Sequence, residues 1–348
     1  MANAGGCDPA GSGIIDLFLD WAVSSGVEHH IHTVGVAGSK PAPPTNQSTI
    51  PVNSQSRVRL GIVDNKGMNS SALRYLPGTC AVVLDSPHSG THYPADFVYA
   101  CDLMTLRRAE DTHVEKLYSF APDMGVSWIE ALFPRSYLDA NRGTTEIDAS
   151  MFESPWPDAL ATDPKVLSKV RLGKGLIWRY TDEGVPIYQR KLSVQEVRQR
   201  IAQYWQPYHA AVAQAIDAAH QRHGYSIHIN CHSMPALASS HATEYPGLVH
   251  ADFVVGDRDS STASKDLSLL ICEHLKSFGY SVEYNHPYKG VELVRRHSNP
   301  QVHRHSVQLE INRKLYMNEQ TLVLTEGFGR LQQHLRSLLE LLMQTDPR

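Results

Sequence analysis

The segment Val82-Val83-Leu84-Asp85-Ser86-Pro87-His88-Ser89-Gly90 organises the interpretation of the whole chain. Residues 82–84 are apolar, and the run is too short for a helix, so it predicts a buried strand. Pro87 and Gly90 then predict a turn after that strand. Ligands bind beyond the carboxyl ends of strands in open α/β sheets, and this turn places His88 at such an end. A loop histidine with a purely structural role is the alternative, so His88 needs support from elsewhere in the chain.

The composition excludes several classes of protein. The chain has 348 residues, of which 42% are hydrophobic and 20% charged, as in an ordinary globular protein. A formal net charge of -4 gives no reason to expect nucleic acid as a partner. No apolar run approaches the roughly 20 residues of a membrane span, so no membrane is expected either. The five cysteines are widely spaced and lack a CxxC pair, which is typical of reduced thiols in a cytoplasmic protein.

Two regions of different composition divide the chain. Residues 1–60 are predicted to form an appendage. They contain a Gly-rich terminus, one short amphipathic helix at 14–23 and a Pro/Ser-rich linker at 37–58 with few apolar residues. Residues 61–348 predict a single folded domain. The oligomeric state is not readable from the sequence.

Strands alternate with helices from about residue 75 onward. Strands are predicted at 81–85, 126–132, 227–233, 251–258, 280–284 and 307–311. Helices are predicted at 111–120, 193–223 and 264–278 and from about 318 to the end, with an irregular insertion at 144–174. This alternation predicts an α/β fold in which helices cover both faces of one sheet, a three-layer α/β/α sandwich.

Polar side chains lie at the ends of five predicted strands or in the loops that follow them. They are His88, Asn141 with Arg142, His232, Asp257 with Arg258, and Glu310 with Arg313. Because loops at one edge of such a sheet converge, we expect a common site. A catalytic zinc commonly takes two histidines and a carboxylate and leaves one position to water, which points to His88 and His232. Asp111 is the candidate carboxylate, with helix N-cap as its alternative role, and Glu110 beside it is interpreted as a solvated charge.

Glu310 lies within an apolar strand, where a carboxylate is costly unless it is paired or functional. Beside a metal it could act as a general base, and the alternative is an internal salt bridge to Arg313 or Arg258. Guanidinium groups match carboxylates in bidentate geometry, so arginines near the site predict a small substrate with one or two carboxylates. The candidates are Arg142, Arg179, Arg258 and Arg313.

Eight separated motifs resemble, in order, those of the N-formylglutamate amidohydrolase family. They are SPHSGTHYP (86–94), EDTHVEKLY (110–118), YLDANRG (137–143), GLIWRY (175–180), NCHSM (230–234), VVGDRDS (254–260), NHPYKG (285–290) and QLEINRKLYMNE (308–319). The resemblance spans residues 75–340. It implies the fold of zinc carboxypeptidases and aspartoacylases, with a mixed, mostly parallel central sheet, and a catalytic domain at 61–348.

The resemblance also implies chemistry. One Zn²⁺ ion, or another divalent metal, would be held by His88, Asp111 and His232, with Glu310 as the general base. The implied reaction hydrolyses the N-acyl amide of an acidic, dicarboxylate N-acyl amino acid. N-formyl-L-glutamate is the leading candidate, and its products, glutamate and formate, would place the enzyme in histidine degradation. The alternatives are another N-acyl amino acid or small peptide as substrate, and a carboxylate-binding homologue without catalytic activity.

Two strings carry the kinship with zinc carboxypeptidases. DANR (139–142) is similar to their substrate-carboxylate segment and CHS (231–233) to their third-ligand segment, so Asn141 and Arg142 would hold a substrate carboxylate. The chain also departs from the expected motifs. Thr91 stands where carboxypeptidases have their acidic ligand, and Asn230 where we expect an aspartate that would tune the metal. Val291 replaces the second glycine of an expected Gly-Gly pair.

Overall fold

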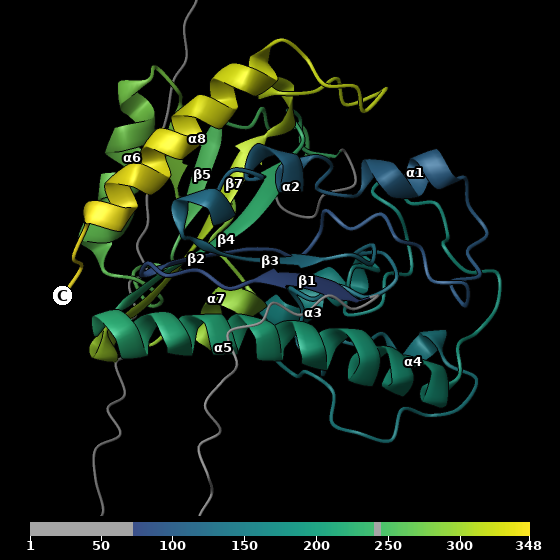
Figure 1. The fold of residues 1–348 in the computed structure, drawn as a ribbon. Coiled ribbons are helices and arrows are strands. Elements are labelled where there is room, and N and C mark those ends of the chain that lie inside the picture. The colour runs from purple at the N-terminus through teal and green to yellow at the C-terminus, as the bar shows by residue number, and fades with distance from the viewer. Residues whose placement is uncertain (1–71, 240–244) are drawn as a thin grey trace, which may run out of the picture. The chain divides into compact units, whose positions relative to one another are not determined.

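The computed structural model describes residues 72–239 and 245–348 (Figure 1). The predictions made for residues 1–60, including the helix at 14–23, lie outside these ranges. The described chain contains a seven-stranded sheet with the order β1-β3-β2-β4-β7-β5-β6. Its strands are β1 (Leu73–Leu76), β2 (Val82–Ser86), β3 (Ser127–Ala131), β4 (Ser226–Met234), β5 (Phe253–Gly256), β6 (Val282–Tyr284) and β7 (Arg304–Asn312).

The sheet is mixed and mostly parallel, as predicted. Strands β3, β2, β4 and β7 run parallel at its centre. β1 is antiparallel to β3, and β5 is antiparallel to β7 but parallel to β6. The pairing places Asp85 of β2 beside Asn230 of β4 and His232 of β4 beside Glu310 of β7. His232 and Glu310, which were predicted to share a site, are therefore lateral neighbours at the carboxyl ends of parallel strands.

Helices cover both faces of the sheet and make three layers (Figure 1). One face packs against the long helix α5 (Gln206–His223), which continues α4 (Val194–Arg200) through a π-helical turn at Ile201–Trp205. The other face packs against α2 (Val114–Leu117), α6 (Lys265–Ser277) and α8 (Gly327–Gln344). The remaining short helices are α1 (Leu103–Arg108), α3 (Pro164–Arg171) and α7 (Glu292–His297), with 3-10 turns at Pro122–Met124, Ala149–Met151, Pro300–Val302 and Arg313–Leu315.

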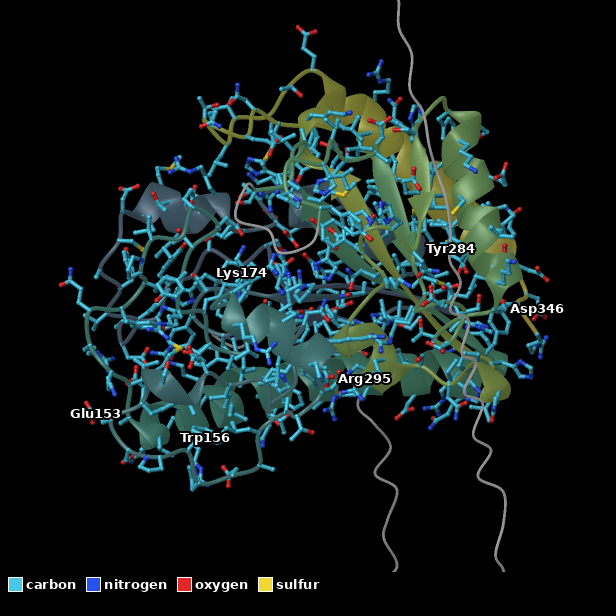
Figure 2. The ribbon with its side chains drawn as sticks, turned by 180° about the vertical axis from the view of Figure 1, so that it is seen from behind. Glu153, Trp156, Lys174, Tyr284, Arg295 and Asp346 are labelled. Carbon is cyan, nitrogen blue, oxygen red and sulfur yellow. The ribbon has the colours of Figure 1, made fainter. Side chains whose placement is uncertain are left out.

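Alternation within the strands explains this layering, because successive side chains point to opposite faces. Val82 and Leu84 of β2 pack in the core under α8, whereas Val83 packs in the core under α5. Residues Glu153 and Trp156 of the predicted insertion lie on the opposite side of the domain from Tyr284 and Asp346 (Figure 2). No helix within the described ranges is long and apolar enough to cross a membrane.

The structure corrects several local predictions. The last helix begins at Gly327 and not near residue 318, because the Asn318 side chain accepts hydrogen bonds from the backbone N–H groups of Gln320 and Thr321 and makes a turn. The insertion at 144–174 contains α3, capped by Asp163. β1, α1 and α7 are not among the predicted elements. Ser193 does cap α4, and Gly224 in a left-handed conformation ends α5, as predicted.

Candidate active site

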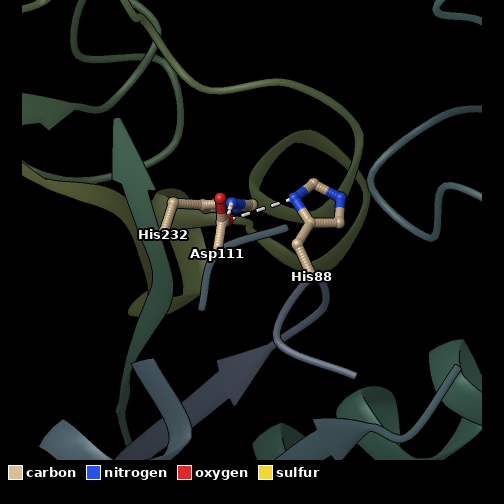
Figure 3. A group of neighbouring side chains, drawn as sticks. All are labelled: His88, Asp111 and His232. Carbon is tan, nitrogen blue, oxygen red and sulfur yellow. Dashed lines mark hydrogen bonds and ion pairs between the residues drawn. The ribbon is translucent and has the colours of Figure 1, made fainter. Parts of the chain in front are cut away.

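Three buried side chains converge at the carboxyl edge of the sheet (Figure 3). His88 lies in the turn after β2, His232 on β4, and Asp111 just before α2. One ligand atom from each residue lies within 4.8 Å of the others, and all three residues are buried. The turn that carries His88 can pack this closely against Leu132 and Phe133 because residue 90 is a glycine. A Cβ at this position would lie 2.4 Å from backbone atoms of both residues.

The His88 imidazole is held from one side only. Its Nε2 lies 2.7 Å from Asp139 Oδ1, an acceptor, so Nε2 carries the proton and donates. The other nitrogen, Nδ1, is buried without a hydrogen-bond partner and lies 3.4 Å from Asp111 Oδ2. A buried polar atom without a partner is costly, and an imidazole arranged in this way is typical of a metal ligand.

His232 has the same arrangement. Its Nε2 lies 2.7 Å from Asn230 Oδ1, and its Nδ1 lies 3.0 Å from Asp111 Oδ2. Both histidines therefore direct Nδ1 toward one carboxylate oxygen. Metal-ligating histidines are usually oriented by a polar partner on the second ring nitrogen, as seen here for each ring.

Asp111 is tied to the site and is not a helix cap. His113 occupies the N-cap position of α2, in a left-handed conformation. Asp111 Oδ1 accepts from Arg313 at 3.2 Å, Ser233 at 3.3 Å and Arg135 at 3.5 Å. Burial opposes the charge, but the two neighbouring histidines and the positive charge of Arg135 hold the pKa of Asp111 well below its usual range. The carboxylate is therefore ionised and available to a cation through Oδ2.

The group fits a metal ion. Ligands about 2.0–2.1 Å from a tetrahedral zinc lie about 3.3 Å apart, close to the 3.0 Å and 3.4 Å separations here. Glu110 does not belong to the group, because Tyr93 and Arg107 donate to its carboxylate. Its interpretation as a solvated charge is wrong, since it is 1% exposed and burial raises its pKa to about 7.

Glu310 lies beside this group on β7, buried and opposite His232. Its Oε1 accepts a hydrogen bond of 2.8 Å from Gln308. Burial raises the pKa of Glu310 to about 7, assisted by the negative charge of Asp111 and opposed by His232 and Arg135. No ion pair within the described ranges includes Glu310, so the predicted alternative of an internal salt bridge is not found.

The predicted arginines differ in what they contact. Arg142 has a buried Nε without a partner, and its Nη1 lies 3.9 Å from Glu146. Arg313 donates from all three nitrogens, to Ser233, to Asp111 and to the carbonyl of Arg108. Arg179 is exposed and pairs with an aspartate, and Arg258 donates to a backbone carbonyl. The partners found for Arg179 and Arg258, Asp148 and the carbonyl oxygen of Gly290, lie outside the His88 group.

Asn141 is buried behind His232. Its Oδ1 accepts from the N–H of Leu293 at 2.9 Å, and its Nδ2 lies 3.0 Å from His232 Nε2. Trp205 donates to the carbonyl of Arg142, so this segment is held from behind by the helical layer.

Two residues in the site are missing from the sequence prediction. Arg135 pairs with Asp139 at 3.3 Å and with Asp111 at 3.5 Å, and its guanidinium lies 4.8 Å from the Trp178 ring centroid. Its Nε is buried without a partner. Burial opposes the charge of Asp139, but His88 and Arg135 lower its pKa. Both residues lie in the polar segment that follows β3, so the strand-end criterion used for Asn141 could have found them.

Comparisons with known proteins show which family and which solved structures this chain resembles. A family model described as N-formylglutamate amidohydrolase matches residues 80–317. N-formylglutamate deformylase of Pseudomonas aeruginosa is 25% identical over 256 residues, which cover 71% of this chain and 86% of the relative. The Pseudomonas putida protein of the same name is 27% identical over 256 residues, with 71% and 85% covered.

Solved structures give the same result. The crystal structure of N-formylglutamate amidohydrolase from Ralstonia eutropha JMP134 is 43% identical in sequence, with a TM-score of 0.72. The match covers 79% of this chain and 98% of that protein. A gene product of Agrobacterium tumefaciens, 19% identical with a TM-score of 0.52, shares the fold; 78% of this chain and 96% of that one are covered.

Proposed function

The chain belongs to the N-formylglutamate amidohydrolase family, and on that premise we propose that it hydrolyses N-formyl-L-glutamate to L-glutamate and formate. The observation that carries this proposal is the buried group of His88, Asp111 and His232 with the carboxylate of Glu310 next to it. A metal held by two imidazoles and a carboxylate, with a general base next to it, is a common catalytic arrangement for amide hydrolysis.

His88, Asp111 and His232 would hold the metal through Nδ1, Oδ2 and Nδ1. A bound Zn²⁺, or another divalent ion, supplies Lewis acidity, which lowers the pKa of water and polarises the acyl carbonyl. Glu310 then takes a proton from water as its oxygen bonds to the acyl carbon. When the C–N bond breaks, Glu310 returns that proton to the leaving nitrogen, and the proton of the formic acid passes to the same amine, so the products are formate and glutamate with its ammonium group.

Arg135 is placed to help the same step. Its guanidinium lies between Asp111 and Asp139, with a buried and unpaired Nε, and its charge acts on Glu310. A fixed guanidinium next to a developing oxyanion stabilises it more strongly in a buried site than in water. We assign Arg135 the role of the cation that stabilises the tetrahedral oxygen.

Arg142 is our candidate for the substrate carboxylate. Its guanidinium has a buried Nε without a partner, so a donor is free for a substrate, and Glu146 is 3.9 Å away, too far for a hydrogen bond. The neighbouring Asn141 helps to fix the position of this segment, because it accepts a hydrogen bond from the N–H of Leu293 and contacts His232.

Turnover of a substrate series tests the proposal. We expect formate release from N-formyl-L-glutamate to exceed turnover of N-formyl-L-aspartate, N-acetyl-L-glutamate and a dipeptide with a C-terminal glutamate. Equal or faster turnover of N-acetyl-L-glutamate or of the dipeptide would assign a different substrate. Turnover of none of the four would favour the alternative of a binding protein without catalysis.

A Glu310→Gln variant tests the mechanism. The amide keeps the size of the side chain but cannot accept a proton, so kcat should fall at least 100-fold. Metal content, measured by atomic absorption, should stay at the wild-type value, because Glu310 is not assigned as a ligand. Unchanged kcat would remove Glu310 from the mechanism.

A further inference from the structure

Asp85 is a buried carboxylate that the mechanism above does not use. It lies at the end of β2, fully inaccessible, next to Asn230 in the sheet register. Burial opposes its charge, but hydrogen bonds lower the pKa of Asp85 below its usual value. An ionised carboxylate is therefore enclosed one strand away from the candidate metal ligands.

A chain of hydrogen bonds joins this carboxylate to His232. Asn230 Nδ2 donates to Asp85 Oδ1 at 2.8 Å, and Asn230 Oδ1 lies 2.7 Å from His232 Nε2. Asn230 and His232 are two residues apart on β4, so their side chains point to the same face of the sheet. The same face carries Asp85, because laterally paired residues of parallel strands point the same way.

The direction of each bond follows from the first. An ionised carboxylate can only accept, so the Asn230 amide must present its NH₂ group to Asp85 and its oxygen to His232. That oxygen can only accept, so His232 Nε2 must carry the proton. Nδ1 is then left with its lone pair facing Asp111 and the metal position. The charge on Asp85 thus decides the tautomer of a histidine two hydrogen bonds away.

Asn141 also contacts His232. Asn141 Nδ2 lies 3.0 Å from the same His232 nitrogen, which would make it a second donor facing a donor. Its hydrogens have other acceptors, Asn230 Oδ1 and Gln308 Oε1, both at 3.4 Å. The Asn141 amide cannot be reversed, since its Oδ1 accepts from the N–H of Leu293.

We infer that Asp85, acting through Asn230, is a positioning residue for the metal site that holds His232 in its metal-binding tautomer. The aspartate expected at position 230 is thereby replaced by an asparagine that transmits the charge of a carboxylate one strand further away. This inference rests on the proposed function, because it requires His232 to be a metal ligand. Partners that orient ligating histidines typically change metal affinity by 10- to 100-fold when they are removed.

The test measures the Zn²⁺ affinity of the full chain by equilibrium competition with a chelator. Asp85→Asn removes the charge, and Asn230→Leu interrupts the relay while the bonds of Asp85 to His228 and Tyr208 remain. Each should weaken Zn²⁺ binding roughly 10- to 100-fold. Tyr208→Phe is the matched control, because it deletes a hydrogen bond to the other oxygen of Asp85 and should change the affinity less than about threefold.

A double variant asks whether the charge itself is transmitted. Asp85→Asn with Asn230→Asp moves the carboxylate next to His232 and should restore affinity to within a few-fold of wild type. Failure of this rescue, or a loss in Tyr208→Phe equal to that in Asp85→Asn, would overturn the relay and indicate a general structural effect. If Asp85→Asn does not fold, Asn230→Leu decides, and wild-type affinity in that variant overturns the relay.

The outcomes separate the two proposals. Tight Zn²⁺ binding by the wild type with equal binding by Asn230→Leu would contradict only the relay. A wild-type chain that does not bind Zn²⁺ would contradict the proposed function and the relay with it.

Discussion

At the scale of single residues, the site depends on which nitrogen of each histidine is already occupied. His88 donates from Nε2 to Asp139, and His232 donates from Nε2 to Asn230. Both rings are left with Nδ1 directed at Asp111. The five arginines predicted or found for the site can be sorted in the same way. Those with a buried nitrogen that lacks a hydrogen-bond partner have a donor to offer to a substrate.

Arg142 and Arg313 should respond differently to the same substitution. Lysine cannot reproduce a bidentate guanidinium. Arg142→Lys should raise KM for the substrate about 10-fold and leave Zn²⁺ affinity unchanged. Arg313→Lys breaks contacts to Asp111 and Ser233, so it should weaken Zn²⁺ binding about 10-fold or more and leave KM unchanged at saturating metal. Chelator competition and steady-state kinetics on both variants provide the measurements.

The reverse result for Arg313 is informative. A raised KM at saturating Zn²⁺, with wild-type metal affinity, would return Arg313 to the substrate-binding role that the sequence predicts for it.

At the scale of elements, the turn after β2 needs a glycine where it passes the segment that follows β3. A Cβ at Gly90 would meet backbone atoms of Leu132 and Phe133 at 2.4 Å, so Gly90→Ala must shift the turn or that segment. We expect a loss of about 1–3 kcal/mol in the free energy of unfolding, the usual cost of overpacking. Gly329→Ala is the control, since nothing lies within 4 Å of its added Cβ in helix α8.

Urea denaturation of both glycine variants checks this. Alanine favours a helix interior by up to about 1 kcal/mol over glycine, so Gly329→Ala should be neutral or stabilising. Equal stability of Gly90→Ala and wild type would show that the turn does not depend on close contact with Leu132 and Phe133.

Helix α5 and the π-helical turn before it hold the DANR segment in place. Trp205 Nε1 donates to the carbonyl of Arg142, and His209 Nε2 donates to the carbonyl of Ala140. The Trp205 and His209 rings stack at 3.8 Å between centroids. His209 Nδ1 accepts from His297 Nε2 at 2.9 Å, which brings α7 into the same contact.

This histidine pair should make the fold sensitive to acid. Burial lowers the pKa of His209 to about 4 and that of His297 to about 3. Neighbouring charges also affect these pKa values. Glu292 and Asp85 raise one or both of them, whereas Arg296 and His228 lower one or both. An unfolded histidine titrates near 6.5, so the unfolded chain takes up protons below that pH before the folded chain does.

The free energy of unfolding should therefore be fully retained above about pH 6.5 and fall as the pH drops toward 4. His209→Gln keeps a donor for the Ala140 carbonyl but does not titrate, so its loss between pH 7 and pH 5 should be about 2 kcal/mol smaller than that of wild type. Denaturant unfolding at both pH values, with chelator present to exclude metal release, measures the difference. Identical pH dependence in the two proteins would show that His209 takes up its proton equally in both states.

At the scale of the whole molecule, the proposed metal joins segments that are far apart in the sequence. His88, Asp111 and His232 follow different elements, so a ligand common to all three can bind only the folded chain. Zn²⁺ at 100 times its Kd should add about 2.7 kcal/mol to the free energy of unfolding. Chelation should lower the Tm of wild type accordingly and leave the Tm of His232→Ala unchanged, as measured by calorimetry. An equal effect of chelator on both proteins would place the metal elsewhere.

Local patterns predicted the strands well because the core strands are short apolar runs bounded by turn residues. The central segments at 81–85, 227–233 and 307–311 each lie within a strand of the sheet or extend one residue beyond it. The predicted start of the last helix was wrong because a side chain competes locally with the helix: Asn318 makes a turn at that position.

The sequence by itself determined the α/β class, the strand ends that carry polar residues, and the identity of His88, His232 and Glu310 as candidates. Those properties follow from hydrophobic periodicity and turn chemistry, which act over a few residues. Only the tertiary structure decided that Asp111 and not Glu110 joins the histidines, and that Arg313 supports a ligand. The reason is physical: pairing within the sheet and burial determine which donors and acceptors are already satisfied, and that depends on contacts between segments more than a hundred residues apart.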